Sequence, residues 1–168
     1  MSKVITAEQF RLVDSKGRIK GLFSSDENDN TIMALLDANG KSKVVLMLSP
    51  DGTPSLSLFD ASRKNGFTLR TSSVSDDSFI LHLLDANSKL RFALVLMSNG
   101  TFGMEFCDAN QKPRFCLEVP PPDSDLILSL LDANEKHRIA LVISPDGSPS
   151  LHILDANGKS IWEQPKNK

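Results

Sequence analysis

One short string of residues recurs seven times along the chain and constrains its fold more than any other feature. An alternating run of apolar residues leads to an aspartate, and Ala-Asn follows that aspartate in five of the seven copies. The seven aspartates are Asp14, Asp37, Asp60, Asp85, Asp108, Asp132 and Asp155. They are spaced 23 to 25 residues apart, which indicates internal duplication of a unit of about 23 residues.

Turn-forming residues stand at both ends of each unit. Asn39-Gly40 predicts a two-residue type I′ turn, since both central residues of that turn need a positive φ. Pro50-Asp51-Gly52, which lies between two aspartate segments, predicts a three-residue loop built on a type I turn and closed by glycine. Connections this short join antiparallel neighbours, so the repeat predicts a series of β-hairpins.

These turns fix which residues face each other across neighbouring strands. The first places Leu35 opposite Val44, and the second places Leu46 opposite Leu56. Counting residues outward from the turn in the same way brings large apolar residues together on one face in every unit. A shift of one residue would place them on opposite faces. We therefore expect a single all-β domain over residues 1–168, an antiparallel meander of seven tandem hairpins with about 14 strands. The hairpins span about residues 8–25, 31–50, 54–72, 78–98, 101–120, 125–144 and 149–163.

The second face of the predicted hairpins alternates in character. It is largely apolar in the even units, as at Ile32 and Val45, and polar in the odd units, as at Ser57 and Thr68. This gives a longer period of about 47 residues, or four strands, repeated three times. The pattern favours a closed body with pseudo-threefold symmetry, similar in period to a β-trefoil or β-prism, in which the bulky side chains share one interior. A flattened barrel, a sandwich or a coiled stack of hairpins also satisfies it.

Composition and charge exclude several classes of protein. A net charge of -2 over 168 residues argues against a dedicated nucleic-acid binder, which usually carries a basic stripe. No apolar run approaches the roughly 18 residues needed to cross a bilayer, and the first residues lack the apolar core of a signal peptide. Two cysteines are too few for a disulfide framework. We therefore expect a cytoplasmic protein that binds neither nucleic acid nor membrane.

The repeated Asp-x-Asn invites a calcium site, but each turn offers one carboxylate and one amide, whereas calcium takes six to eight oxygens. Asp and Asn are also favoured in hairpin turns for local reasons. The acidic loop 26–30 is a richer source of oxygen atoms, and Asp26 and Asp29 are its candidate ligands, although it lacks a glycine at the bend. Histidine and cysteine spacings typical of zinc sites are missing. We expect no metal and no cofactor.

Catalytic motifs are also missing from the sequence. It contains no Gly-x-Ser-x-Gly elbow and no glycine-rich phosphate loop, and Cys107 and Cys116 fit half-buried reduced thiols better than a catalytic pair. The expectation is a protein that is not an enzyme.

A few residues are candidates for binding. His82 and His152 occupy equivalent strand positions, and Trp162 is expected on the second face as an exposed anchor or a packed side chain. Basic residues recur just after the turn, and they predict either a ring for an anionic ligand or local pairs with the aspartate of the same unit. These basic residues are Lys43, Arg91, Arg114 and Arg138, with Arg18 in the first unit.

The sequence favours a non-catalytic β-repeat module for protein interaction or assembly. If closure leaves the apolar second face of the even hairpins uncovered, a protein partner or another copy must cover it. The alternative is a module that binds a small ligand or carbohydrate through three longer loops that follow odd hairpins and are expected to cluster at one end. These loops span residues 26–30, 71–77 and 119–123.

Overall fold

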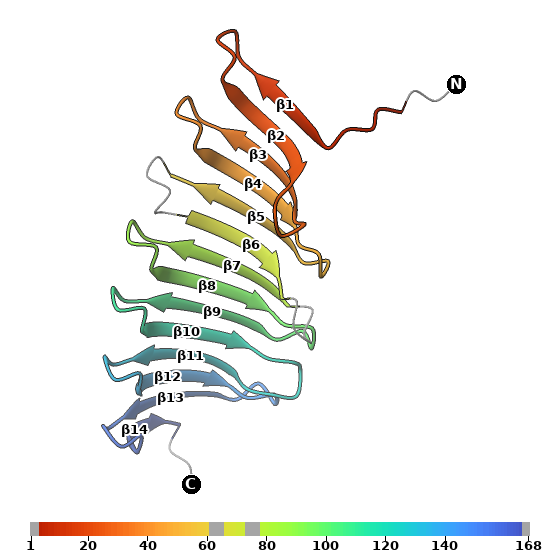
Figure 1. The fold of residues 1–168 in the computed structure, drawn as a ribbon. Coiled ribbons are helices and arrows are strands. Elements are labelled where there is room, and N and C mark those ends of the chain that lie inside the picture. The colour runs from red at the N-terminus through yellow and green to blue at the C-terminus, as the bar shows by residue number, and fades with distance from the viewer. Residues whose placement is uncertain (1–3, 61–65, 73–77, 166–168) are drawn as a thin grey trace.

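The computed structural model describes residues 4–60, 66–72 and 78–165, and these residues form fourteen strands in a single antiparallel sheet. The strands pair strictly in chain order (Figure 1). Their bounds are β1 Gln9–Val13, β2 Ile19–Ser25, β3 Thr31–Leu36, β4 Ser42–Leu48, β5 Pro54–Phe59, β6 Gly66–Thr71, β7 Phe79–Leu84, β8 Leu90–Leu96, β9 Phe102–Cys107, β10 Pro113–Val119, β11 Leu126–Leu131, β12 His137–Ile143, β13 Pro149–Leu154 and β14 Ser160–Gln164. The described residues form no helix that could cross a membrane.

The strand registers confirm the predicted meander. Leu35 faces Val44 between β3 and β4, and Leu46 faces Leu56 between β4 and β5. The other hairpins likewise pair large apolar residues on one face, except where Gly21 faces Leu12 and Gln164 faces Leu151. The alternation of the sequence therefore decides both the pairing of the strands and the side to which each residue points.

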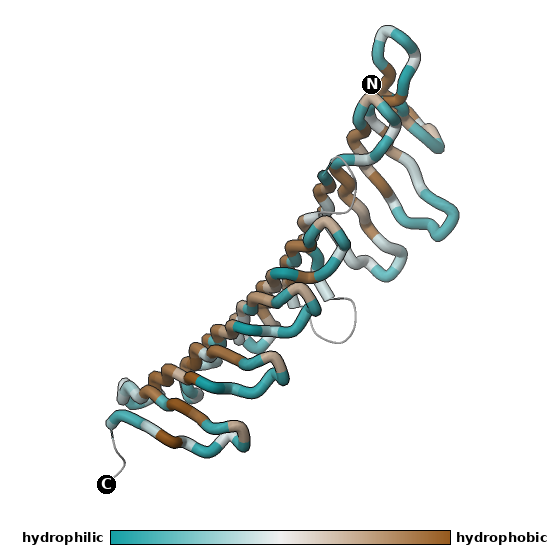
Figure 2. Tube along the Cα trace, turned by 90° about the vertical axis from the view of Figure 1, so that its left-hand side faces the viewer, coloured by the Kyte–Doolittle hydropathy of each residue, from teal (hydrophilic) through white to brown (hydrophobic). Residues whose placement is uncertain are grey.

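The sheet does not close on itself. Strand β1 pairs only with β2, strand β14 pairs only with β13, and the two strands lie at opposite ends of the sheet (Figure 1). Seen from the side, residues 4–60, 66–72 and 78–165 form one elongated layer, and no second layer of strands lies across from it (Figure 2). The closed, pseudo-threefold body that the sequence favoured is therefore not confirmed.

The turn after Asp37 differs from the expected type I′ turn. The Gly40 N–H donates to the Asp37 carbonyl at 3.1 Å and the Lys41 carbonyl accepts from the Asp37 N–H at 2.9 Å, which closes a three-residue loop. Gly40 has a φ of 75°, while Asn39 keeps a negative φ, so only one residue of the pair is left-handed. The physical reason is the Asp37 carboxylate, whose Oδ1 accepts the N–H groups of Asn39 and Lys41 at 2.8 and 3.0 Å.

A β-bulge restores the register behind this turn. Leu36 pairs with Ser42 and Leu35 pairs with Val44, so Lys43 has no partner across the strands. The longer loop and the extra bulged residue together bring the same side chains opposite each other as a two-residue turn would. The register was therefore predicted correctly from a turn type that was wrong.

Candidate functional site

The side of the sheet that carries the large apolar residues is called the bulky face here. Three rows of side chains run along it, one residue per strand, and the central and turn-side rows cross all fourteen strands. The central row consists of Phe10, Phe23, Met33, Leu46, Leu56, Leu69, Leu81, Leu94, Met104, Leu117, Leu128, Leu141, Leu151 and Gln164. The row nearer the repeated aspartates runs from Leu12 to Trp162, and the third includes Leu48, Phe79 and Ile143. No strand position on this face carries a charged residue among those described.

The bulky face is open to solvent in the single chain. Leu46 is 49% exposed, Phe79 53% and Leu141 42%, and many of their neighbours in the three rows exceed one third. At a strand spacing of about 4.8 Å and a rise of about 3.3 Å per residue, the face is about 65 Å long and about 15 Å wide, or roughly 1,000 Å². A typical monomer exposes no apolar patch beyond roughly 300–600 Å². The bulky face is therefore a candidate contact surface.

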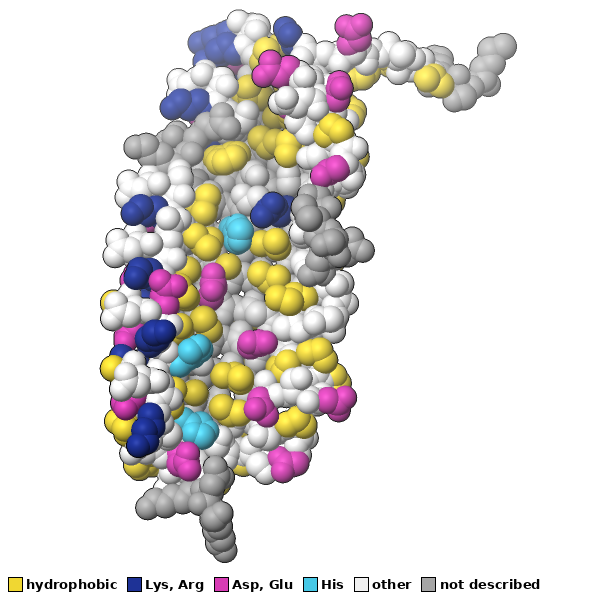
Figure 3. Space-filling model, turned by 60° about the horizontal axis from the view of Figure 1, so that its bottom comes forward, with side chains coloured by type: hydrophobic (Ala, Val, Ile, Leu, Met, Phe, Trp, Pro, Cys, Tyr) yellow, Lys and Arg dark blue, Asp and Glu magenta, His cyan; other side chains and the backbone are white. Residues whose placement is uncertain are grey.

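The opposite side, called the hollow face here, is concave. Figure 2 views the sheet from the edge that carries the repeated aspartates, and in this view the ends of the hairpins bend toward one side of the sheet. Small side chains occupy the middle of several strands on the hollow face, and Ala34, Ala93 and Ser129 are only 4%, 5% and 1% exposed. Figure 3 shows this face, on which histidine and acidic side chains gather among apolar ones. The Ser129 Oγ is buried there without a hydrogen-bond partner.

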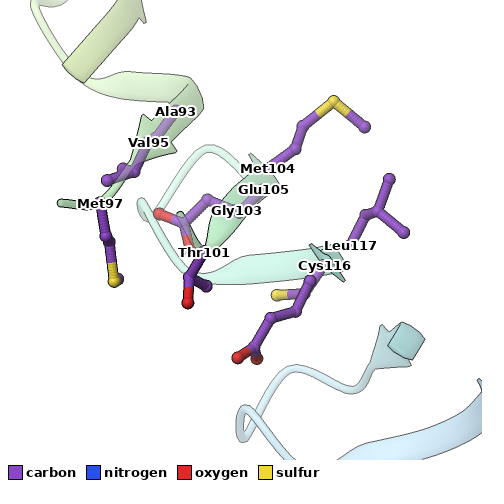
Figure 4. Close-up of a pocket in the computed structure, with 10 residues that line it drawn as sticks. Ala93, Val95, Met97, Thr101, Gly103, Met104, Glu105, Cys116 and Leu117 are labelled. Carbon is purple, nitrogen blue, oxygen red and sulfur yellow. The ribbon is translucent and has the colours of Figure 1, made fainter. Parts of the chain in front are cut away.

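A hollow of about 320 Å³ lies on this face between β8, β9 and β10 (Figure 4). Ala93 and Val95 line one side, and Cys116 lines the other. A Cβ placed on Gly103 would meet nothing within 4 Å, so the missing side chain of this glycine leaves part of the space open. Burial raises the pKa of Cys116, which keeps its thiol protonated and unreactive as a nucleophile.

Burial also decides the protonation of His82, at the centre of the hollow face. Partial burial lowers its pKa, the Arg70 cation lowers it further, and Glu105 acts in the opposite direction. His82 faces Thr68 and Ala93 across its two neighbouring strands. His82 and His152 lie on strands β7 and β13 of one open sheet, so the sheet does not bring them together.

A contact that the sequence did not suggest links Ser150, His152 and Glu163 on the hollow face. The Ser150 Oγ and the His152 Nε2 are 2.9 Å apart, and the His152 Nδ1 lies 3.6 Å from the Glu163 Oε2. This order of groups is that of a hydrolase triad. A triad also needs hydrogen-bond donors at the developing oxyanion. Ser150 lies inside β13 and pairs with Val142 of β12, and the residues that follow it in β13 pair with both β12 and β14, which engages their backbone. The signal was the Ser-x-His spacing on a strand, which places both side chains on one face.

Trp162 lies on the bulky face, not on the second face where the sequence placed it. It faces Ile153 across the last hairpin and is 43% exposed. The count that pairs Leu35 with Val44 across the Asp37 turn also pairs Ile153 with Trp162 across the Asp155 turn, so the second-face placement departed from the predicted register. The bulge at Ile161 offsets the extra loop residue, as the bulge at Lys43 does behind the Asp37 turn. Trp162 thus extends the apolar row that includes Ile153.

The recurring basic residues all occupy the bulged position behind the aspartate turn. These residues are Lys43, Arg91, Arg114 and Arg138, and the equivalent residue of the first unit is Lys20 rather than Arg18. Arg91 Nη1 lies 3.6 Å from Asp85 Oδ2, and Arg114 Nη1 lies 3.6 Å from Asp108 Oδ2. Lys43 and Arg138 face the carboxylates of their own turns in the same way, and in the first unit Arg18 lies 2.7 Å from Asp14 Oδ2. These pairs leave less of the positive charge for an external anion.

Neighbouring turns along this edge are also tied to each other. Lys89 Nζ donates to the Ala109 carbonyl at 3.1 Å, and Lys112 Nζ donates to the Ala133 carbonyl at 2.9 Å. In the six aspartate turns that the structure describes in full, the Oδ1 atom accepts backbone N–H groups of its own turn. Those hydrogen bonds lower the pKa of Asp85, Asp108 and Asp132. In the described residues this edge is thus a series of turns capped by their aspartates, and five of these aspartates also form ion pairs.

Asp26 uses its carboxylate in the same way as the repeated aspartates. Its Oδ1 accepts the N–H groups of Asn28 and Asn30 at 2.9 and 3.0 Å, and hydrogen bonds from Asn30 lower its pKa. Asp29 takes the left-handed position of the turn, with a φ of 60°. No cluster of three His, Cys, Asp or Glu side chains in the described part of the chain could hold a metal ion.

The longer loops lie along one edge of the sheet and are well separated. They join β2 to β3, β6 to β7 and β10 to β11, so four strand spacings, or about 19 Å, separate each from the next. Residues 73–77 of the middle loop, like residues 61–65 of the third aspartate turn, lie outside the described residues. The strand ends that carry the three loops therefore do not meet at one place.

Comparisons with known proteins give no family for this chain. No protein family model matches the sequence, and no curated protein matches it.

Proposed function

We propose that this protein is a non-catalytic interaction and assembly module that acts through its bulky face. The supporting observation is the set of uncharged apolar rows that the single sheet leaves exposed. Removing roughly 1,000 Å² of apolar surface from water is favourable by on the order of 25 kcal/mol before the costs of association. A surface of this kind gains far more from a protein partner than from contact with water.

The alternative, a module that binds a small ligand or carbohydrate, receives less support from the positions of the longer loops and of Trp162. The longer loops stand about 19 Å apart along one edge. Trp162, the aromatic side chain that could stack on a sugar, belongs to an apolar row of the bulky face. A carbohydrate site needs polar groups that converge beside an aromatic side chain, and the surroundings of Trp162 are apolar.

Photo-cross-linking in cells tests the interaction function. A benzophenone amino acid replaces Leu94 on the bulky face or, as the matched control, Val95, the next residue of β8 on the hollow face. We expect the Leu94 position to cross-link to a protein that mass spectrometry identifies, and the Val95 position to give little product. Equal yields at both positions, or none at Leu94, would refute the interaction function.

The non-catalytic part of the proposal has its own test at Ser150. We expect a fluorophosphonate probe to leave Ser150 unlabelled, and nitrophenyl acetate hydrolysis to be the same in the parent protein and in Ser150→Ala. Labelling of Ser150 that His152→Gln abolishes would show that the Ser150, His152 and Glu163 contact is a working triad. That result would overturn the non-catalytic assignment.

A further inference from the structure

The extent of the bulky face matches one half of a stable dimer interface. Each copy offers roughly 1,000 Å² of apolar surface, so burying this face on two copies removes up to roughly 2,000 Å² from water. Standard protein interfaces bury about 1,600 Å² in total, and obligate homodimers begin near 2,000 Å². The area is therefore sufficient for a permanent contact between two such faces.

The chemistry of the face limits what can cover it. A charged group buried against an uncharged, apolar surface loses its water and gains no partner. The covering surface must therefore be uncharged over about the same length. The hollow face of another copy does not qualify, because Arg70, Glu105 and Glu118 project from its strands. The bulky face of another copy does qualify, since its strands carry no charged side chain that would be buried without a partner or repel the same face of the first copy.

We infer that the bulky face of this protein is covered by the bulky face of a second copy, which makes the native protein a two-layer homodimer. The inference rests on the proposed interaction function and names its partner. A two-fold axis between the layers places equivalent residues of the two copies in one self-complementary contact. Two sheets packed in this way lie about 10 Å apart with interdigitated side chains.

The shape of the sheet indicates where the contact is closest. The hollow face is the concave side, so the bulky face is the outer side of the curve (Figure 2). The central row runs along the middle of this outer side. A hollow of about 190 Å³ beside this row, lined by Leu46, Leu56, Leu69 and Phe79, can receive a large side chain from the facing layer. Overlap is greatest when the axis passes near β7 and β8, which places Leu94 close to the second copy.

Cross-linking of the purified protein tests this arrangement. Leu94→Cys and the control Val95→Cys are made in a chain whose own thiols are removed by Cys107→Ser and Cys116→Ser, and each is treated with a short bismaleimide. We expect Leu94→Cys to give a product of twice the chain mass and Val95→Cys to stay at the mass of one chain. Circular dichroism of both variants checks that the sheet has formed.

The outcomes separate this inference from the function on which it rests. If Leu94→Cys is not cross-linked, or if both variants are cross-linked equally, the homodimer is overturned. The interaction function still stands in that case if the benzophenone at Leu94 reaches a different protein in cells. If neither variant folds, native mass spectrometry of the unsubstituted protein decides, since a dimer supports the inference and a single chain overturns it.

Discussion

The aspartates of the repeat act at the scale of single hydrogen bonds. Asp37 shows the arrangement, in which one carboxylate oxygen accepts two backbone N–H groups of its own turn and the other faces Lys43 at 3.5 Å. The sequence already indicated that Asp and Asn serve the turn locally, because both residues favour hairpin turns without any ligand. The predicted register across the last turn already places Glu163 opposite His152, so extending the count to residue 163 would have brought Ser150, His152 and Glu163 together.

His82 provides a prediction at this scale. Its pKa in the folded protein is below the ordinary value of 6.5, mainly because of burial, so the unfolded chain binds more protons once the pH falls through 6.5. The stability that neutral His82 contributes is complete above that pH and is lost as the pH falls through the folded pKa. We expect the urea midpoint of the parent protein to fall between about pH 7.5 and about pH 5.5, and that of His82→Gln to fall less. An equal fall in both proteins would contradict this.

At the scale of the hairpin, the sequence predicted the register better than the turn. Asn39-Gly40 fits a type I′ turn in isolation, but Asp37 two residues earlier caps a type I turn that leaves only Gly40 left-handed. The bulge that compensates carries Lys43, and the same kind of bulge at Ile161 keeps Trp162 opposite Ile153 on the bulky face. A residue count through a turn cannot reveal a bulge, because the extra residue changes no pattern before it.

The left-handed position of these turns gives a reciprocal prediction. Gly40 has a φ of 75° and Ser88, at the same place in a later turn, has a φ of 60°. A Cβ on Gly40 would meet nothing within 4 Å. A side chain there would therefore lower the free energy of unfolding only through the strain of a left-handed backbone, without any steric clash. We expect Gly40→Ser to lower the free energy of unfolding by about 1 kcal/mol and Ser88→Gly to raise it by about 0.5 kcal/mol. Urea unfolding measures both, and changes of the same sign would contradict the turn assignment.

For the whole molecule, the sequence predicted which side chains share a face and left open what lies opposite them. Alternation of apolar residues places Leu46, Leu94 and Leu141 together, and the structure puts all three in the central row of the bulky face. It does not place them in an interior, since Leu46 and Leu141 are half exposed in the single sheet. Closure of the sheet and contact with a second chain both satisfy the same alternation, so only the three-dimensional arrangement separates them.

The mass of the protein in solution tests most directly whether the bulky face is covered by a second copy. Sedimentation equilibrium of the purified chain is predicted to give twice the 18.4 kDa of one chain. Leu46→Lys, which places a charge on the bulky face, is predicted to shift the protein toward single chains, while Ser57→Lys on the hollow face leaves the dimer intact. A mass of 18.4 kDa for the unsubstituted protein at all concentrations would contradict the account.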